Sequence, residues 1–344
     1  MSTSNKLIAT VSSNNNAIDC YLDTAAELSK IDRKNHHQVS EDGKPLVYDL
    51  MITVSTPSTD QISAPDKQIL MSGTVLTAPN NWQTRNSVRM AHFVRDDLRR
   101  EAGVSKGSIG KYAKTMRLNL DNNMFDIAYN SQKNLASNES RYQRLYASAD
   151  PDSLPAYSSG TSRFKGGVWD YTQLAQVETD DANAATEYYL TVCDGHVGSP
   201  SAGYTTVGVI NAYNERRQTT RDASTVNAGG DTQFVDNDSP FFRVPQQDIS
   251  EDAYVEITLD EQDNPPYDRT VGSTSDSVKP QPAEYFQLTA QNTMATFRVQ
   301  APLGLLQFDF REMFGTGYVD GAVGAWTIVQ NVFVEVECLG TYEM

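Results

Sequence analysis

Two patterns that could support nucleophilic or phosphate chemistry lie in one loop after a predicted helix. Gly103 to Gly107, GVSKG, matches the G-x-S-x-G pattern of a serine nucleophile. That chemistry needs a strand before the serine and a helix after it, whereas here the helix comes first. Gly110 and Lys111 end a loose match to a phosphate-binding loop, but Tyr112 stands where Ser or Thr would bind magnesium. We therefore interpret both patterns as loop sequence and predict no catalytic residues and no enzymatic activity.

Histidine is scarce, and its spacing does not suit a metal centre. The four histidines are His36, His37, His92 and His196. None forms the H-x-H or H-E-x-x-H spacing that places two imidazoles on one metal ion. His92 lies within the predicted helix, where packing or a surface hydrogen bond is the ordinary role. The histidine pattern thus disfavours a two-domain cupin-like enzyme.

Carboxylates crowd the start of one long connection, DEQDNPPYD, in which Asp260, Asp263 and Asp268 are the candidate ligands. Oxygen-rich clusters of this kind can hold calcium. The glycine of an EF-hand loop is absent, so a solvated loop is the competing interpretation. The sequence thus offers one candidate ion site, for calcium, and predicts no other cofactor.

The clearest regular element is the stretch from Thr84 to Gly103, TRNSVRMAHFVRDDLRREAG. Apolar residues recur there at steps of three and four, and charged residues fill the positions between them, which is typical of an amphipathic helix. Asn86 is the candidate N-terminal cap, and Gly103 is the candidate end. Arg99 and Arg100 lie in the last turn, where the helix dipole favours cations.

Most other regular segments alternate apolar and polar residues, which predicts strands with one buried face. The clearest of them are Leu46 to Val54, Ile69 to Thr77, Ala253 to Leu259, and Val332 to Cys338. A second, shorter helix is predicted from Thr205 to Arg217. The sequence therefore predicts an all-β or mainly β fold, in which strands, one short helix and further strands occur twice.

A polar stretch with two prolines, from Ala149 to Arg163, separates these two sets of elements and is the candidate linker. A chain of 344 residues also exceeds what one core usually holds. We therefore predict two β-sandwich domains in tandem, 1–158 and 159–344, with the boundary placed to within about 15 residues.

Charge is distributed unevenly between these halves. The chain has a net charge of -16, and residues 1–158 hold 18 Lys and Arg against 17 Asp and Glu. The remaining residues hold 10 against 27. Neither half offers a dense basic surface, and the first 32 residues contain only Lys6 and Lys30 as cations. Direct nucleic-acid binding is therefore disfavoured.

Apolar runs, the N-terminal residues and the cysteines together indicate the compartment in which the chain is made. No apolar run approaches the length of a membrane span, and the N-terminal residues lack the plan of a signal peptide. The three cysteines, Cys20, Cys193 and Cys338, lie far apart and are expected to be buried thiols rather than a disulfide framework. These features predict synthesis in a reducing host cytoplasm.

Two β-rich halves, each with an inserted helix, resemble the double jelly-roll major capsid proteins of the lineage that includes the adenovirus hexon and the coats of membrane-containing icosahedral phages. Within it the chain looks most like the coats of the corticovirus, tectivirus and finnlakevirus groups. The resemblance implies two jelly rolls and a homotrimeric capsomer of pseudo-hexagonal outline in a virion capsid. It also implies a penton protein as a partner and a lipid membrane beneath the shell.

Two further expectations concern alternatives and assembly. The competing function is a phage appendage or carbohydrate-binding β-sandwich protein, which recognises a surface rather than enclosing a particle. The long polar connections Gln218 to Pro240 and Glu261 to Pro282 are expected to contact neighbouring chains. Within the trimer, the nearly neutral first half of one subunit is expected to contact the acidic second half of the next.

Overall fold

The computed structural model describes residues 6–11, 17–32, 34–55, 69–110, 113–124, 142–144, 171–177, 185–195, 197–199, 204–217, 278–289, 292–314 and 332–344. The helices are α1 (Thr24–Asp32), α2 (Trp82–Glu101), the short 3-10 helix η2 (Lys106–Ser108) and α4 (Val209–Arg217). The strands are β1 (Lys6–Val11), β2 (Ala17–Asp23), β3 (Leu46–Ser55), β4 (Ile69–Thr77), β5 (Tyr142–Arg144), β6 (Gln173–Val177), β7 (Ala185–Thr191), β8 (Val197–Ser199), β9 (Tyr204–Gly208), β10 (Gln281–Leu288), β11 (Met294–Pro302), β12 (Leu305–Phe314) and β13 (Val332–Glu343). This part of the chain is mostly β, as predicted.

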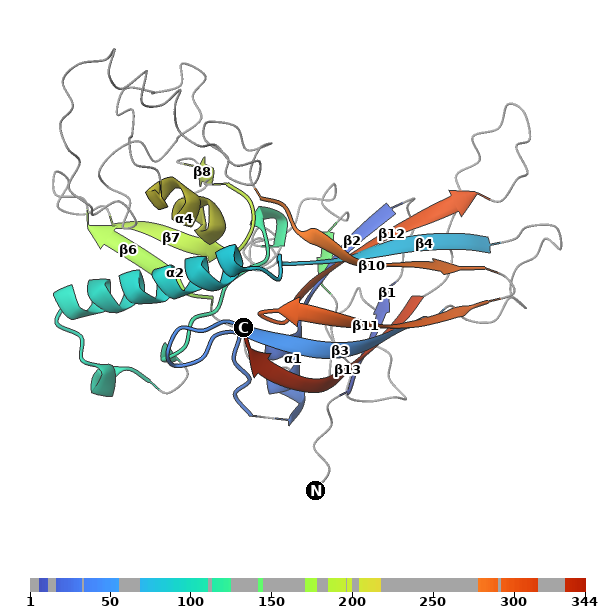
Figure 1. Ribbon diagram of the computed structural model, residues 1–344, viewed down its shortest axis with the longest axis horizontal. Coiled ribbons are helices and arrows are strands. Elements are labelled where there is room, and N and C mark those ends of the chain that lie inside the picture. The colour runs from blue at the N-terminus through green and yellow to red at the C-terminus, as the bar shows by residue number, and fades with distance from the viewer. Residues whose placement is uncertain are drawn as a thin grey trace, which may run out of the picture.

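Two sheets face each other in a sandwich, and Figure 1 shows them as two layers. The first sheet has the strand order β1-β13-β3-β11, and the second has the order β10-β4-β12-β2-β5. All neighbours are antiparallel except β5, which pairs in parallel with β2. Along the chain, β1 to β4 alternate between the two sheets, and so do β10 to β13 after them.

Each strand from the start of the chain pairs with a strand counted back from its end. Strand β1 pairs with β13, β2 with β12, β3 with β11, and β4 with β10. The pairs β3 with β13 and β4 with β12 join these units into sheets. Apart from β5, the sandwich is therefore built by strands from both ends of the chain, and residues 78–280, which we call the insertion, lie between β4 and β10.

This topology corrects the predicted domain arrangement. The sheets do not sort into 1–158 and 159–344, because strands from both ranges alternate within the same sheets. The predicted linker, 149–163, lies outside the described residues. Alternation of apolar and polar residues indicates where a strand lies and which face it buries, but it carries no information about which strand becomes its neighbour.

The sandwich core consists of the inward residues of both sheets. Strand β3 alternates buried and half-buried residues along most of its length, with Leu50, Ile52 and Val54 facing the core. Aromatic rings fill the centre, where Phe308 stacks on Phe310 at a centroid distance of 5.9 Å. Phe286 requires a glycine opposite it, because a Cβ on Gly73 would lie 2.2 Å from the ring.

Helix α2 confirms the predicted amphipathic element but begins two residues earlier. Asn81, not Asn86, is the cap, since its side-chain oxygen accepts a 3.1 Å hydrogen bond from the Thr84 amide. Gly103 follows the helix with a φ of 71°, in the left-handed region that glycine adopts without strain. Arg99 and Arg100 occupy the last turn, as predicted.

The described part of the insertion packs around a second core, to which sandwich residues such as Tyr21 and Leu305 also contribute. A third sheet of order β6-β7-β9-β8 lies with α2 and α4 at the opposite end of the molecule from the free tips of the sandwich (Figure 1). A second hydrophobic cluster joins these elements and includes Val88, Leu190 and Ile210. The predicted helix Thr205 to Arg217 is corrected here, because its first residues form β9 and the helix begins at Val209.

None of the helices in the ranges given above is both long and apolar enough to cross a lipid bilayer.

Candidate functional site on helix α2

The insertion is fixed to the sandwich by buried polar contacts. Asp23, at the end of β2, accepts hydrogen bonds of 2.8 Å from Gln38 and 3.1 Å from the Tyr171 hydroxyl. Gln38 in turn bonds both backbone groups of Leu118, accepting from its amide at 2.6 Å and donating to its carbonyl at 3.1 Å. Because these groups are buried and paired, they fix the position of the insertion against the sandwich.

A second buried joint centres on Asp121. Its carboxylate accepts a 2.9 Å hydrogen bond from the Tyr21 hydroxyl of β2 and a 2.7 Å bond from the Met124 amide. Burial raises the pKa of Asp121 to about 7, and the nearby Asp194 charge adds to the increase, while the two hydrogen bonds oppose it. Asp194 itself bonds the Lys279 ammonium at 2.5 Å.

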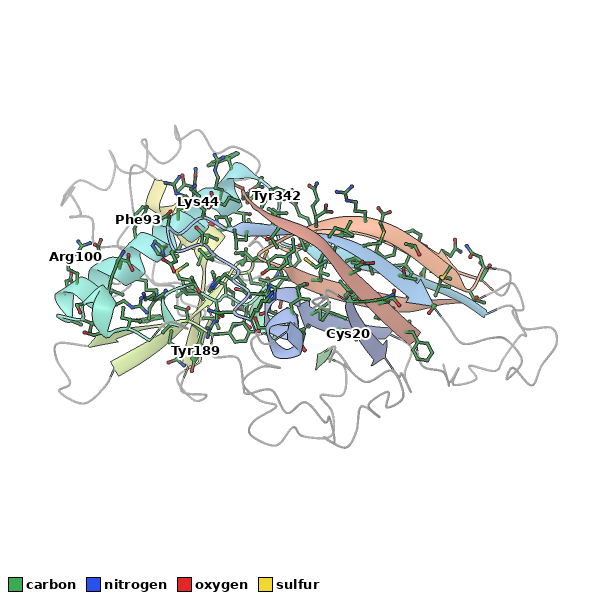
Figure 2. All side chains as sticks on the ribbon, turned by 90° about the horizontal axis from the view of Figure 1, so that it is seen from below. Cys20, Lys44, Phe93, Arg100, Tyr189 and Tyr342 are labelled. Carbon is green, nitrogen blue, oxygen red and sulfur yellow. The ribbon has the colours of Figure 1, made fainter. Side chains whose placement is uncertain are left out.

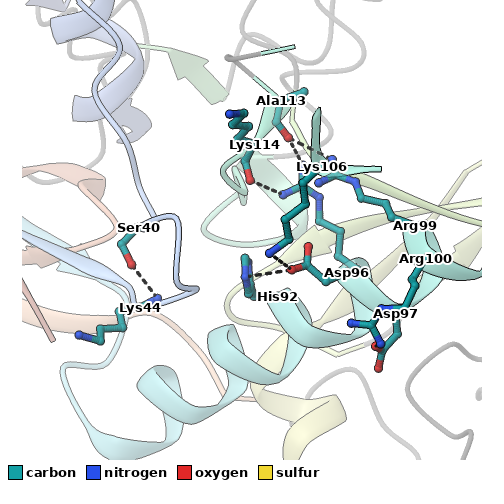
Figure 3. Close-up of polar contacts among 11 residues, drawn as sticks. Ser40, Lys44, His92, Asp96, Asp97, Arg99, Arg100, Lys106, Ala113 and Lys114 are labelled. Atoms are coloured by element: carbon teal, nitrogen blue, oxygen red, sulfur yellow. Dashed lines mark hydrogen bonds and ion pairs between the residues drawn. The ribbon is translucent and has the colours of Figure 1, made fainter. Parts of the chain in front are cut away.

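The inner side of α2 is held by its own arginines, and Figure 3 shows these contacts. Arg95 donates to the carbonyls of Ala113 at 2.5 Å and Lys114 at 3.3 Å, and Arg99 donates to Ala113 at 3.0 Å. Burial, with the neighbouring Arg99 charge, lowers the pKa of Arg95 to about 10. These two arginines therefore hold the 113–114 segment against the helix and do not face outward.

A small charge cluster flanks this inner side. Asp96 lies 3.5 Å from His92 Nε2 and 3.1 Å from the Lys106 ammonium (Figure 3). Burial lowers the pKa of His92, with Asp96 opposing and nearby cations such as Arg95 and Lys106 assisting the decrease. The ring packs against the turn at Gly43, where a Cβ would lie 2.6 Å from it. His92 thus packs the helix against the 40–45 turn.

The outer side of α2 is an exposed row of aromatic and basic residues. At the helical spacing of about 100° per residue, Trp82, Arg89, Phe93 and Arg100 fall within a narrow arc. The side chains of Trp82 and Phe93 are 39% and 55% exposed. Arg85 and Arg89 are also exposed, and Arg100 forms a 3.0 Å ion pair with Asp97. We call Trp82, Arg85, Arg89, Phe93 and Arg100 the α2 outer face.

The α2 outer face continues toward one end of the first sheet. Figure 2 places Arg100, Phe93, Lys44 and Tyr342 along one side of the molecule, with Tyr189 on the opposite side. Tyr342 is 45% exposed, and Lys44 forms a 2.5 Å ion pair with Glu343. Exposed aromatic rings and arginines therefore lie on this side of the molecule, and both are residue types that protein interfaces enrich.

The structure places the residues singled out in the sequence in separate locations. His36 and His37 lie in the connection before β3, and His92 lies in α2. Ser105 is exposed and shares a 2.8 Å hydrogen bond with Ser108 in the η2 turn. Within the ranges described here, no group of three His, Cys, Asp or Glu residues could hold a metal ion.

Several predicted residues lie outside the described ranges. These are His196, the phosphate-loop residues Lys111 and Tyr112, and the calcium candidates Asp260, Asp263 and Asp268. The calcium site stays a prediction. The strand predicted from Ala253 to Leu259 and most of the two long connections also fall outside these ranges.

Sequence reasoning missed the residues of the two joints. Tyr21 is 100 positions from Asp121 in the chain, and Gln38 is 80 positions from Leu118. No local spacing marks such pairs, because each depends on how the insertion folds back onto β2. The sequence pattern indicates that one face of α2 is charged, but it does not mark Trp82 and Phe93 as members of that face.

Comparison of the chain with protein-family models, with curated proteins and with solved structures finds no match in any of the three.

Proposed function

We propose that the chain is a major capsid protein, and that its shell-building unit is a single jelly roll formed by the two ends of the chain. In a jelly roll, eight strands wind through two facing sheets as two Greek keys. The observation that carries the proposal is the pairing of β1 with β13, β2 with β12, β3 with β11 and β4 with β10.

This pairing is what a long antiparallel hairpin produces when it is rolled across two layers. The first and last strands, β1 and β13, are neighbours in one sheet, and the strands next to them in sequence, β2 and β12, are neighbours in the other. Viral capsid domains and lectin domains both use this architecture. The fold therefore supports either a shell protein or a surface-recognition protein, and the expected appendage function is the second candidate.

The insertion supports the first of these two candidates, the shell protein. It separates β4 from β10 and carries α2, whose outer face has the aromatic and arginine composition of a subunit contact rather than of a concave sugar site. An insertion of this length between two strands of a jelly roll suits a subunit that must contact several neighbours. We therefore favour the capsid function.

The observed fold alters one part of the capsid proposal. Two jelly rolls per chain would give six sandwiches in a trimeric capsomer, but the described residues form only one sandwich per chain. The internal membrane, the penton partner and the virion location stay predictions that rest on the sequence resemblance. The capsid proposal itself requires only that many copies of this chain associate into a closed shell.

The test is the size and shape of the assembled protein. The purified chain is concentrated at several salt concentrations and examined by sedimentation velocity and negative-stain electron microscopy. A capsid protein is expected to form large closed particles of uniform diameter, or curved fragments of them. A monomer that binds glycans, or a small ring or fibre with no larger species, would contradict the proposal and favour the appendage function.

A further inference from the structure

The α2 outer face exposes two large aromatic side chains outside the hydrophobic cores of the described residues, since Trp82 is 39% and Phe93 is 55% exposed. Neither hydrophobic cluster of the described residues includes Trp82 or Phe93. The packing side of the helix is supplied instead by residues such as Val88 and Ala91, both fully buried. Covering these rings with a partner surface would remove apolar area from water, which favours association.

Tryptophan, arginine and other aromatic residues are also the types that protein interfaces concentrate at their energetic centres. Phe93 lies between Arg89 and Arg100 on one stripe, and Trp82 stands at the start of the same stripe. Each ring is held by a neighbour: Trp82 meets Tyr213 of α4 edge-on at 6.3 Å between centroids, and Phe93 meets His92 at 5.9 Å. Prepositioned rings lose little conformational freedom on binding.

Charge favours one kind of partner. The α2 outer face carries Arg85, Arg89 and Arg100, of which Arg100 pairs with Asp97, whereas the chain as a whole has a net charge of -16. The stretch 218–277 alone holds 13 acidic residues and three arginines. A cationic, aromatic stripe on an acidic protein is complementary to the remaining surface of another molecule of the same protein.

We infer that the α2 outer face binds an acidic surface of a second copy of this chain. The contact is heterologous, since a stripe bearing Arg85 and Arg89 would repel the same stripe on its neighbour. Burial of Phe93 and Trp82 supplies most of the affinity, and the arginines supply orientation and a modest share that salt screens over about 8 Å at physiological ionic strength. The inference rests on the proposed function in expecting self-association, but it concerns a single pairwise contact rather than the shell.

The experiment compares self-association of matched variants by sedimentation equilibrium at subunit concentrations below those that give large particles. Phe93→Ala is set against Tyr285→Ala on β10, because both side chains are 55% exposed in the isolated chain. The double variant Arg85→Gln with Arg89→Gln has its own control, the double variant Lys114→Gln with Gln281→Glu. The control lowers the net charge of the chain by the same amount, but at exposed positions outside α2.

The inference predicts that Phe93→Ala raises the dissociation constant about tenfold or more, the effect of a residue at the centre of an interface. The arginine pair should weaken association at low salt and less so at high salt. Both controls should associate like the wild type, and circular dichroism should show all variants folded. Equal association of Phe93→Ala and wild type would overturn the inference, and so would a monomeric wild type.

Binding of a single-stranded oligonucleotide tests the competing possibility that the α2 outer face binds nucleic acid. Binding of the oligonucleotide by a monomeric chain, lost on Arg85→Gln with Arg89→Gln, would assign the α2 outer face to nucleic acid and overturn the inference. Failure of the capsid proposal is distinguishable. Closed shells that assemble unchanged with Phe93→Ala would overturn only this contact, whereas small oligomers lost on Phe93→Ala, with no shells formed, would overturn only the capsid function.

Discussion

The Tyr21 hydroxyl of β2 donates a 2.9 Å hydrogen bond to the Asp121 carboxylate, and this bond joins the sandwich to the insertion. Both residues are almost completely buried. A buried carboxylate that loses a donor retains the cost of its desolvation, so the bond makes the two parts of the chain energetically dependent on each other.

Tyr21→Phe tests that dependence. The substitution keeps the ring and removes only the hydroxyl, which leaves one Asp121 oxygen without this donor. We expect a loss of about 1–3 kcal/mol in the free energy of unfolding. Urea denaturation followed by circular dichroism measures it, with Tyr285→Phe as the exposed control. Equal midpoints for wild type and Tyr21→Phe would show that the joint carries no stability.

The raised pKa of Asp121 predicts a pH dependence with a definite sign. In the unfolded chain an aspartate titrates near about 3.9, whereas in the folded protein the pKa of Asp121 is about 7. The folded state therefore holds the proton more tightly, and the contribution of this group to stability is lost as pH rises between these two values.

Asp121→Asn should flatten the part of this decline that belongs to Asp121. The net negative charge of the chain also lowers stability as pH rises, but it acts similarly on wild type and variant, so the difference between them isolates the one carboxyl. Urea midpoints at pH 5 and pH 8 supply the measurement. A variant that loses as much stability as the wild type over this interval would disprove the assignment.

Gly73→Ala should destabilise the sandwich. The added Cβ would lie 2.2 Å from the Phe286 ring, so the ring or the strand must shift. Overpacking of this kind costs about 1–3 kcal/mol. Gly340→Ala is the matched control, because nothing lies within 4 Å of its Cβ position. A thermal midpoint for Gly73→Ala equal to that of the control would mean that the sheets are not packed as closely as described.

Arg95→Ala should destabilise the insertion, while Arg89→Ala on the same helix should not. Arg95 donates to two carbonyls of the 113–114 segment, and its removal leaves the Lys114 carbonyl without this donor and the Ala113 carbonyl with Arg99 alone. The expected cost is about 1.5–3 kcal/mol. Hydrogen exchange measured by mass spectrometry should show faster exchange near residue 113 in Arg95→Ala alone. Unchanged protection there would contradict the role of Arg95.

The sequence predicts individual elements better than their arrangement. Ile69 to Thr77 is a strand with the predicted bounds, and Leu46 to Val54 differs from β3 by one residue. Helix α2 is predictable because its apolar face repeats from Val88 to Ala102, over about four turns. Asn81 was missed as its cap because Trp82 and Gln83, which follow it, interrupt the apolar pattern that usually marks a helix start.

Which strand pairs with which could not be predicted from the sequence in the same way. Strand β1 pairs with β13 across more than 320 residues, with Leu7 opposite Val336. Period-two alternation is satisfied equally by pairing with any strand of matching faces, so the tandem arrangement and the observed one fit the same pattern. The pairing is decided by the closed core that all eight strands share, and only the folded chain shows it.

Electron cryomicroscopy of the purified chain, under conditions that promote assembly, tests the central claim most directly. The account predicts a closed icosahedral shell in which each subunit places one sandwich, with β1 beside β13 and the insertion between β4 and β10, in the shell wall. Assembly into a tail-like or fibrous appendage, or a chain that never advances beyond a monomer, would contradict it.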